Sequence, residues 1–338
     1  MPEDARPAGG GVTAAAGIGR DTLFVPRGGS ADDAVPPFRF DADVARVFPD
    51  MLDRSIPGYA SIVAQTGLLA ARFARPDTRL YDLGCSLGAS ALAMRAALAT
   101  HRDDGDDDGD DDGDDDDGDG DGGDGGDGGV GSDAGGESDL ASGTGGVECE
   151  RGDRDEHRRG SDGRDFERYR GCRITGVDKS PAMIERARTL VADAVAATPP
   201  EIQAPPIDLT EADLVDFPLA RCSVTAMNFT LQFVAPGARD ELLAGVARAL
   251  VPGGALILSE KLRFEDPDVD ALHVGMYHAF KRANGYSTSE IARKRAALEN
   301  VLVPDTLAGL EARLDAAGFA RASVWFQCFN FVSLVAIR

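Results

Sequence analysis

A run of aspartate and glycine from Asp103 to Gly129 sets the strongest limit on how this chain can fold. Such a segment cannot bury enough apolar surface to offset the entropy lost on ordering, and the mixed polar stretch that follows is similar. We therefore expect residues 101–170 to be a disordered, acidic surface insertion. The residues on its two sides must then build one compact domain together.

The insertion also holds most of the chain's negative charge. Residues 101–170 contain 27 acidic and 8 basic side chains, and the whole chain has a formal net charge of -23, so the remainder carries only -4. A nearly neutral remainder lacks the basic face of nucleic-acid-binding proteins, so no direct nucleic-acid contact is expected. The acidic run also lacks the flanking apolar helices and spaced glutamate of a calcium loop, so no metal site is expected.

Several features predict a cytoplasmic protein without membrane contact. The five cysteines are odd in number and show no CxxC spacing, which is typical of a reducing compartment. The first residues form no apolar signal region, and no run of about 18 apolar residues is present. Residues 1–38 are rich in Gly, Ala and Pro and are expected to be a mostly disordered tail, with the single domain spanning 39–338.

Outside the insertion, strand patterns alternate with helical ones. Helical periodicity starts at Asp41 and resumes after the Pro57-Gly58 break. The alternation predicts an α/β fold with a doubly wound, mostly parallel sheet and an antiparallel C-terminal strand pair. Strands are expected at about 79–83, 173–177, 202–207, 223–229, 255–259, 323–326 and 331–337. Helices are expected at about 181–195, 238–250 and 306–317, with a polar helical region over 268–299.

The first predicted strand runs into a turn of small residues, Gly84-Cys85-Ser86. Such a strand-to-helix turn lets a ligand approach the backbone closely, because glycine has no Cβ. Nucleotide-binding folds place an acid about 20 residues later, at the end of the second strand, to bond the ribose hydroxyls. Asp178 lies 94 positions after Gly84, or 24 once the 70-residue insertion is removed. The spacing therefore predicts Asp178 as the ribose-binding acid.

Two later positions fit the same pocket. Asp213 follows the third predicted strand, where an acid can accept the adenine amino group, and Asn228 ends the fourth, where its amide faces the crevice. The turn lacks the third glycine of a dinucleotide fingerprint. These residues favour S-adenosyl-L-methionine (SAM) over NAD. Cys85 has no neighbours that suggest a nucleophile, so a packing role is expected.

Several longer stretches of the chain match a known family. They are RDTLF (20–24), VFPDM (47–51), RSIPGY (54–59), YDLGCSLGAS (81–90), SPAMIER (180–186), NFTLQF (228–233), PGGALILSEK (252–261), FKRANGYS (280–287) and WFQCFNF (325–331). In these stretches the chain resembles class I SAM-dependent methyltransferases, with their Rossmann-like fold, and more specifically the carboxy-S-adenosyl-L-methionine synthase family. The similarity covers nearly the whole chain outside the tail and the insertion.

This resemblance implies a specific reaction. Members of the family make carboxy-S-adenosyl-L-methionine from SAM and prephenate and release phenylpyruvate. The product serves a tRNA carboxymethyltransferase that forms uridine-5-oxyacetic acid at the wobble position. The resemblance also implies a homodimer. The chemistry needs a dry pocket and a fixed positive charge for the new carboxylate.

The resemblance also implies which residues bind the ligand. Arg295 takes the place that binds the product carboxylate, and Lys179 stands where the family has asparagine. The full set implied for cofactor contact is Tyr59, Gly84, Cys85, Ser86, Asp178, Lys179, Asp213, Leu214, Asn228 and Arg295.

The sequence around Arg295 adds its own expectation. Ser287-Thr288-Ser289-Glu290 matches a capping box, so a helix is expected to begin after Ser287. Ile291, Arg295 and Leu298 would then share one face, which predicts apolar neighbours for Arg295. A guanidinium suits the role because its planar fork grips a carboxylate with two parallel hydrogen bonds.

Two alternatives stay open from the residues alone. An ordinary SAM-dependent methyltransferase acting on a small molecule or RNA has no need of Arg295, and a SAM sensor binds without turnover. His273 and His278 are interpreted as polar helix positions and not as bases.

Overall fold

The computed structural model of the chain describes residues 19–26, 35–100 and 169–338. Within these ranges the strands form one sheet with the order β3-β2-β1-β4-β5-β7-β6. The strands β1 to β5 are parallel to one another, whereas β7 is antiparallel to both β5 and β6. The predicted sheet with an antiparallel C-terminal pair is confirmed. The strands are β1 (Arg79–Leu83), β2 (Arg173–Asp178), β3 (Ile207–Glu211), β4 (Cys222–Asn228), β5 (Leu250–Lys261), β6 (Arg321–Cys328) and β7 (Phe331–Ile337).

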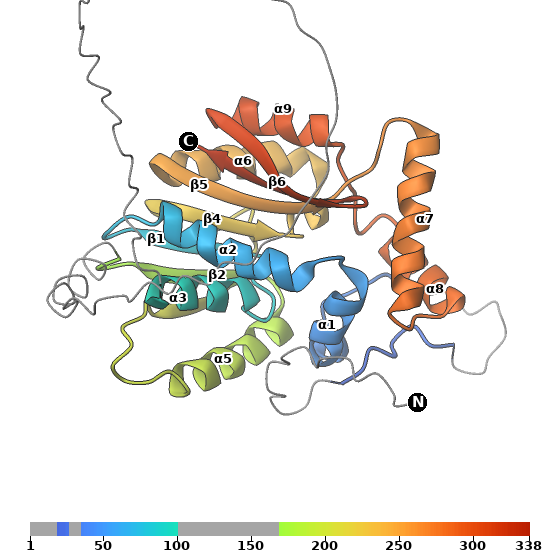
Figure 1. Ribbon diagram of the computed structural model, residues 1–338, viewed down its shortest axis with the longest axis horizontal. Coiled ribbons are helices and arrows are strands. Elements are labelled where there is room, and N and C mark those ends of the chain that lie inside the picture. Colours follow the sequence, from blue (N-terminus) through green and yellow to red (C-terminus); the bar gives the residue numbers. More distant parts are fainter. Residues whose placement is uncertain (1–18, 27–34, 101–168) are drawn as a thin grey trace, which may run out of the picture. The chain divides into compact units, whose positions relative to one another are not determined.

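Helices cover both faces of the sheet (Figure 1). Apolar residues of α2 and α3 pack on one face, and those of α6 and α9 pack on the other. The helices α7 and α8 follow β5 and lie beyond its carboxyl end (Figure 1). The helices are α1 (Ala42–Ser55), α2 (Tyr59–Phe73), α3 (Ala89–Thr100), α5 (Pro181–Ala196), α6 (Pro236–Ala249), α7 (Pro267–Ala283), α8 (Thr288–Leu298) and α9 (Leu307–Ala317), with a 3-10 turn η1 (Leu231–Phe233).

The central strands are buried on both faces, as parallel strands between two helical layers must be. Leu80, Val224 and Ile257 face the α2–α3 layer, whereas Leu83 and Leu258 face the α6–α9 layer. This double burial explains why these strands read as continuous apolar runs. The strand order also places the carboxyl ends of β1 and β4 side by side. The order reverses at this point, and folds of this type bind their ligands there.

One predicted strand was misplaced. A strand was expected at about 202–207, but β3 begins at Ile207. Pro205 and Pro206 precede it, and neither has an N–H group to donate to a neighbouring strand. The ladder to β2 therefore starts only at Ile207, which pairs with Ile174.

Residues on the outer side of both expected domain boundaries take part in the fold. Asp21, placed by sequence in the tail, is only 2% exposed, and Leu23 and Phe24 pack against the cluster around α1. Tyr169, placed in the insertion, is buried in the α2–α3 core and donates its hydroxyl hydrogen to the Ala71 carbonyl. Side chains that pair with distant partners hold both segments in the fold.

Among the described helices, none combines the length and the apolar character needed to cross a membrane.

Candidate active site

The turn after β1 is built around Gly84. Its φ of +77° lies in the left-handed region, and a Cβ there would come within 2.2 Å of Thr230 Oγ1. The N–H groups of Gly84 and Cys85 both donate to the Val177 carbonyl, which joins the turn to the end of β2. Only glycine meets both demands, so the turn is packed tightly between β2 and the segment after β4.

Asp178 organises the neighbouring turn. Its carboxylate accepts hydrogen bonds from the backbone N–H of Ser86 at 3.0 Å and of Ser180 at 2.8 Å. Burial raises the pKa of this carboxyl, whereas the hydrogen bonds favour its ionised form. The acid predicted from the corrected spacing thus lies against the Gly84 turn. The adjacent Lys179 is exposed, so its side chain is free of the packed turn.

Asp82 is a site residue that the sequence analysis missed. It is 2% exposed and accepts one hydrogen bond, from the N–H of Ala91 at 2.9 Å. Burial raises the pKa of Asp82 to about 7, and the charge of Asp178 adds to the rise. No lysine or arginine within the described ranges forms an ion pair with it. The signal was available in the sequence, since Asp82 is an acid inside the apolar strand Arg79–Leu83.

The Asn228 side chain makes hydrogen bonds within the fold at the end of β4. Its amide nitrogen donates to Thr66 and Ser90, and its amide oxygen accepts from Ser259 at 2.7 Å. These three bonds were not expected from the sequence, and they fix the orientation of the amide at the strand end. Asn228 thus ties the end of β4 to α2, α3 and β5, which holds the floor of the crevice in place.

The remaining predicted residues lie around the same strand ends. Tyr59 begins α2, and its ring centroid is 6.4 Å from that of Phe229, which follows Asn228. Asp213 and Leu214 come just after β3; Asp213 is exposed and accepts the N–H of Val215, whereas Leu214 packs against the core. Burial raises the pKa of the Cys85 thiol well above its usual value, so the expected packing role agrees with its surroundings.

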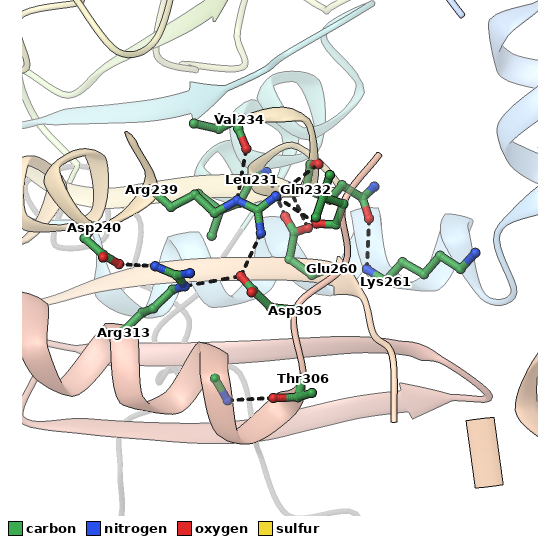
Figure 2. A network of polar contacts seen from close by, with 12 residues as sticks. Leu231, Gln232, Val234, Arg239, Asp240, Glu260, Lys261, Asp305, Thr306 and Arg313 are labelled. Carbon is green, nitrogen blue, oxygen red and sulfur yellow. Dashed lines mark hydrogen bonds and ion pairs between the residues drawn. The ribbon is translucent and has the colours of Figure 1, made fainter. Parts of the chain in front are cut away.

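A buried polar network supports the segment after β4 (Figure 2). Both carboxylate oxygens of Glu260 accept backbone N–H groups, from Leu231 at 2.8 Å and Gln232 at 2.9 Å. Arg239 is fully buried, and its guanidinium donates to Asp305 and to the Val234, Gln232 and Val303 carbonyls. The next residue of β5, Lys261, donates its backbone N–H to the Gln232 side-chain oxygen at 3.1 Å, and its side chain extends away from this network (Figure 2).

Helix α8 confirms one expectation and corrects another. The capping box is present, with Ser287 and Glu290 bonded reciprocally. The buried face of the helix consists of Ile291, Lys294 and Ala297, so Lys294 is the buried cation and Arg295 is exposed. The predicted apolar surroundings of Arg295 are therefore wrong, because the face is one residue out of register.

Arg295 nevertheless lies in a defined place. It lines a groove of about 640 Å³ between α8, α7 and the segment after β5, together with His278 and Asp270. Its positive charge contributes to lowering the pKa of both Lys261 and His278, although burial is the larger cause for each. Arg295 and Lys261 thus form a cationic cluster beside the carboxyl end of β5, and the lowered pKa favours the neutral form of His278 next to them. Among the described residues, no group of His, Cys, Asp and Glu is arranged to hold a metal ion.

Comparison with known proteins identifies relatives that carry the same name. A family model described as a methyltransferase domain matches residues 159–254. The chain is 39% identical over 319 residues to the carboxy-S-adenosyl-L-methionine synthase of Yersinia enterocolitica, covering 94% of this chain and 90% of the relative. It is 43% identical over 303 residues to the enzyme of the same name from Pseudomonas paraeruginosa, covering 90% and 92%. The Klebsiella pneumoniae enzyme of that name is 38% identical over 319 residues, covering 94% and 97%.

Proposed function

The chain belongs to the carboxy-S-adenosyl-L-methionine synthase family, and from this membership we propose that prephenate is the carboxyl donor in its reaction. The enzyme is a transferase whose substrate is SAM and whose product is carboxy-S-adenosyl-L-methionine. In the proposed reaction, prephenate loses carbon dioxide and hydroxide and leaves as phenylpyruvate. The SAM methyl group loses a proton, which forms water with the hydroxide, and its carbon takes up the carbon dioxide.

The residues at the crevice fit a cationic adenosyl ligand. Asp82 is a buried carboxylate and Asp178 a half-buried one at the ends of adjacent strands, and Asp82 has no ion-pair partner among the described residues. A sulfonium and an ammonium group supply the charge that such carboxylates lack. The residues proposed to contact the ligand are Tyr59, Gly84, Cys85, Ser86, Asp178, Lys179, Asp213, Leu214 and Asn228.

The cationic cluster is the observation that carries the proposal. Carboxyl transfer creates a new anion, whereas methyl transfer does not, so a synthase needs fixed positive charge where an ordinary methyltransferase needs none. Arg295 and Lys261 supply that charge beside the crevice. We assign Arg295 to the product carboxylate because its planar fork can make two parallel hydrogen bonds.

Exclusion of water is the second requirement. A carbanion next to sulfur is quenched by water, and carbon dioxide must be captured before it diffuses away. The aromatic residues Tyr59, Phe229, Tyr277 and Phe331 form one apolar cluster at the carboxyl ends of β4 and β5. This cluster supports a pocket wall that keeps bulk water from the reacting atoms.

The direct test is to incubate the purified chain with SAM and prephenate and to weigh the nucleoside product. A gain of about 44 Da over SAM, the mass of carbon dioxide, together with stoichiometric phenylpyruvate supports the proposal. Methylation of an added acceptor with no such product would identify an ordinary methyltransferase, and binding without turnover would identify a sensor.

The partners belong to the same proposal. We propose a cytoplasmic homodimer whose product feeds a tRNA carboxymethyltransferase. Helix α7 supports the dimer, because only Tyr277 and Lys281 of its residues are buried while Val269, Leu272 and Met276 are exposed. Light scattering of the wild type and of Leu272→Glu distinguishes a dimer from a monomer; an unchanged mass for the variant would contradict this interface.

A further inference from the structure

The chain uses lysine in very few places. Of its 35 basic residues only four are lysines, and three of these, Lys261, Lys281 and Lys294, lie within or next to α7 and α8. Arginine supplies nearly all other positive charge. A lysine differs from an arginine in presenting a compact ammonium group on a flexible stem, with a pKa that burial can lower.

One of the three lysines has an evident structural partner. Lys294 lies 3.8 Å from the Asp21 carboxylate and donates a hydrogen bond to Ser55. Lys261 and Lys281 form no ion pair with any described residue. Their Nζ atoms lie 5.0 and 4.4 Å from the centroid of the same ring, that of Tyr277. Two lysines thus share one aromatic contact. No described carboxylate forms an ion pair with either of them, although the charge of Asp270 acts on Lys261 and that of Asp21 acts on Lys281 from farther away.

The surroundings of this pair disfavour its charged form. Lys281 is 5% exposed, and burial, together with the charges of Lys294 and Lys261, lowers its pKa to about 6, so the amine is mostly neutral at pH 7. Burial also lowers the pKa of Lys261. A nearby anion would favour the ammonium form, so a buried amine without an ion-pair partner beside a second lysine points to an anionic ligand.

The pair is continuous with the adenosyl crevice. Ring centroids connect Tyr277 to Phe331 at 5.0 Å, Phe331 to Phe229 at 6.0 Å and Phe229 to Tyr59 at 6.4 Å. This aromatic wall leads from the lysines to the residue at the start of α2 that is proposed to bind the cofactor. A ring-bearing ligand can therefore contact the wall while its charged groups reach the lysines.

A nearby amide shows the same lack of a partner. Asn330 is 1% exposed, and neither its amide nitrogen nor its amide oxygen has a hydrogen-bond partner within the described part of the chain. Its carbonyl accepts the N–H of Leu262, which places Asn330 beside Lys261. A buried amide left unsatisfied also points to a missing polar ligand.

We propose that Lys261 and Lys281 bind the carboxylates of the carboxyl donor and hold its ring against the Tyr277–Phe331 wall. This assignment rests on the proposed function and extends it by naming the donor-binding residues. Arg295 then receives the new carboxylate on the product, and the two lysines position the donor from which that carboxylate comes. Each lysine suits one carboxylate of a dianionic donor.

Substitution by methionine separates this role from a structural one. Methionine preserves the apolar stem and removes the charge, so Lys261→Met and Lys281→Met should fold well. Because a buried amine without an ion-pair partner is replaced by an apolar group, Tm should stay unchanged or rise by a few degrees. The KM for prephenate should rise on the order of ten- to a hundredfold for each variant, as expected for loss of a charge-assisted hydrogen bond. The KM for SAM should change less than about twofold.

The matched control is Arg282→Met, which removes an exposed cation adjacent to Lys281. It should leave both KM values unchanged. An unaltered KM for prephenate in both lysine variants would overturn the inference while leaving the proposed function intact. A fall in Tm with equal losses for both substrates would show that the lysines are structural. Failure of the wild type to use prephenate at all would instead refute the proposed function.

Discussion

The Lys294 ammonium lies 3.8 Å from the Asp21 carboxylate, and both side chains are buried although 273 positions separate them in the chain. The Tyr286 hydroxyl donates to the same carboxylate, and the Arg54 guanidinium stacks 4.0 Å from the centre of the Tyr286 ring. These contacts join the N-terminal segment to α1 and α8. Because Lys294 is anchored on one side of α8, the next residue, Arg295, is directed to the other side, toward the groove.

Breaking this ion pair should destabilise the fold. Lys294→Met leaves the Asp21 carboxylate buried without its cation, and loss of one partner of a buried pair costs about 3–5 kcal/mol. Urea unfolding of Lys294→Met, Asp21→Asn and the double variant measures the coupling. We expect the double variant to be more stable than the sum of the single losses predicts. Additive losses would mean that the two groups do not interact.

Arg295 should be required for the product and dispensable for SAM binding. Arg295→Lys keeps the charge but loses the planar fork, so carboxy-SAM formation should fall about 10- to 100-fold, and Arg295→Ala should fall at least as far. The Kd for SAM, measured by calorimetry, should change little. Arg293→Lys on the same helix is the control. Full activity in Arg295→Lys would show that a simple positive charge is sufficient.

Glu260 should make stability depend on pH in a defined direction. Burial raises the pKa of Glu260 from 4.5 to about 8. The contribution of Glu260 to the free energy of unfolding is therefore fully present below pH 4.5 and is lost as the pH rises through 8. In Glu260→Gln the side-chain N–H faces a backbone N–H, and because two donors cannot pair, the stability of the fold should fall by about 1–3 kcal/mol. The stability gap between wild type and variant should narrow from pH 5 to pH 8.5 in urea titrations. The exposed Glu241→Gln should show no gap, and a gap that widens with pH would contradict the raised pKa.

The sequence predicted those parts of the fold that depend on local patterns. β1 was placed at its observed bounds, and the capping box located the start of α8, because hydrophobic runs and caps act over a few residues. The buried face of α8 was missed by one residue because Lys294 is held there by Asp21, a partner that no local pattern reveals. Tyr169 was missed for the same reason, since its hydroxyl bonds to α2.

The candidate site likewise contains residues that local patterns predict and residues whose roles depend on distant contacts. The Gly84 turn and Asp178 could be found from spacing because both lie at strand ends in a fixed order. The roles of Asn228 and of the lysine pair depend on contacts between elements far apart in the chain. Thr66, Ser90 and Ser259 all bind the Asn228 amide, and nothing in the sequence pairs them.

Asp82 should make SAM affinity rise with pH. The pKa of the Asp82 carboxyl is about 7 in the protein alone, so much of this carboxyl is protonated below neutral pH. A cationic ligand favours its ionised form. Affinity should therefore increase from pH 6 to about 7.5 and then level off. Calorimetry on Asp82→Asn should show weaker and pH-independent binding, with the exposed Asp208→Asn as control. If the affinity for SAM rose with pH in Asp82→Asn as it does in Asp208→Asn, a group other than Asp82 would be responsible for the pH dependence.

Removal of the acidic segment should leave the enzyme folded and active. Deletion of residues 103–165 shortens the connection between α3 and Tyr169 roughly tenfold, and loop-closure entropy predicts a gain of up to about 2 kcal/mol. The deletion also removes 26 acidic and 5 basic residues, which changes the net charge from -23 to -2, so solubility is the property expected to fall. A second variant with a short Gly-Ser linker in place of the segment guards against strain in the shortened connection. Thermal unfolding and turnover should match the wild type in at least the linker variant, whereas a large loss of either in both variants would show that the segment supports the fold.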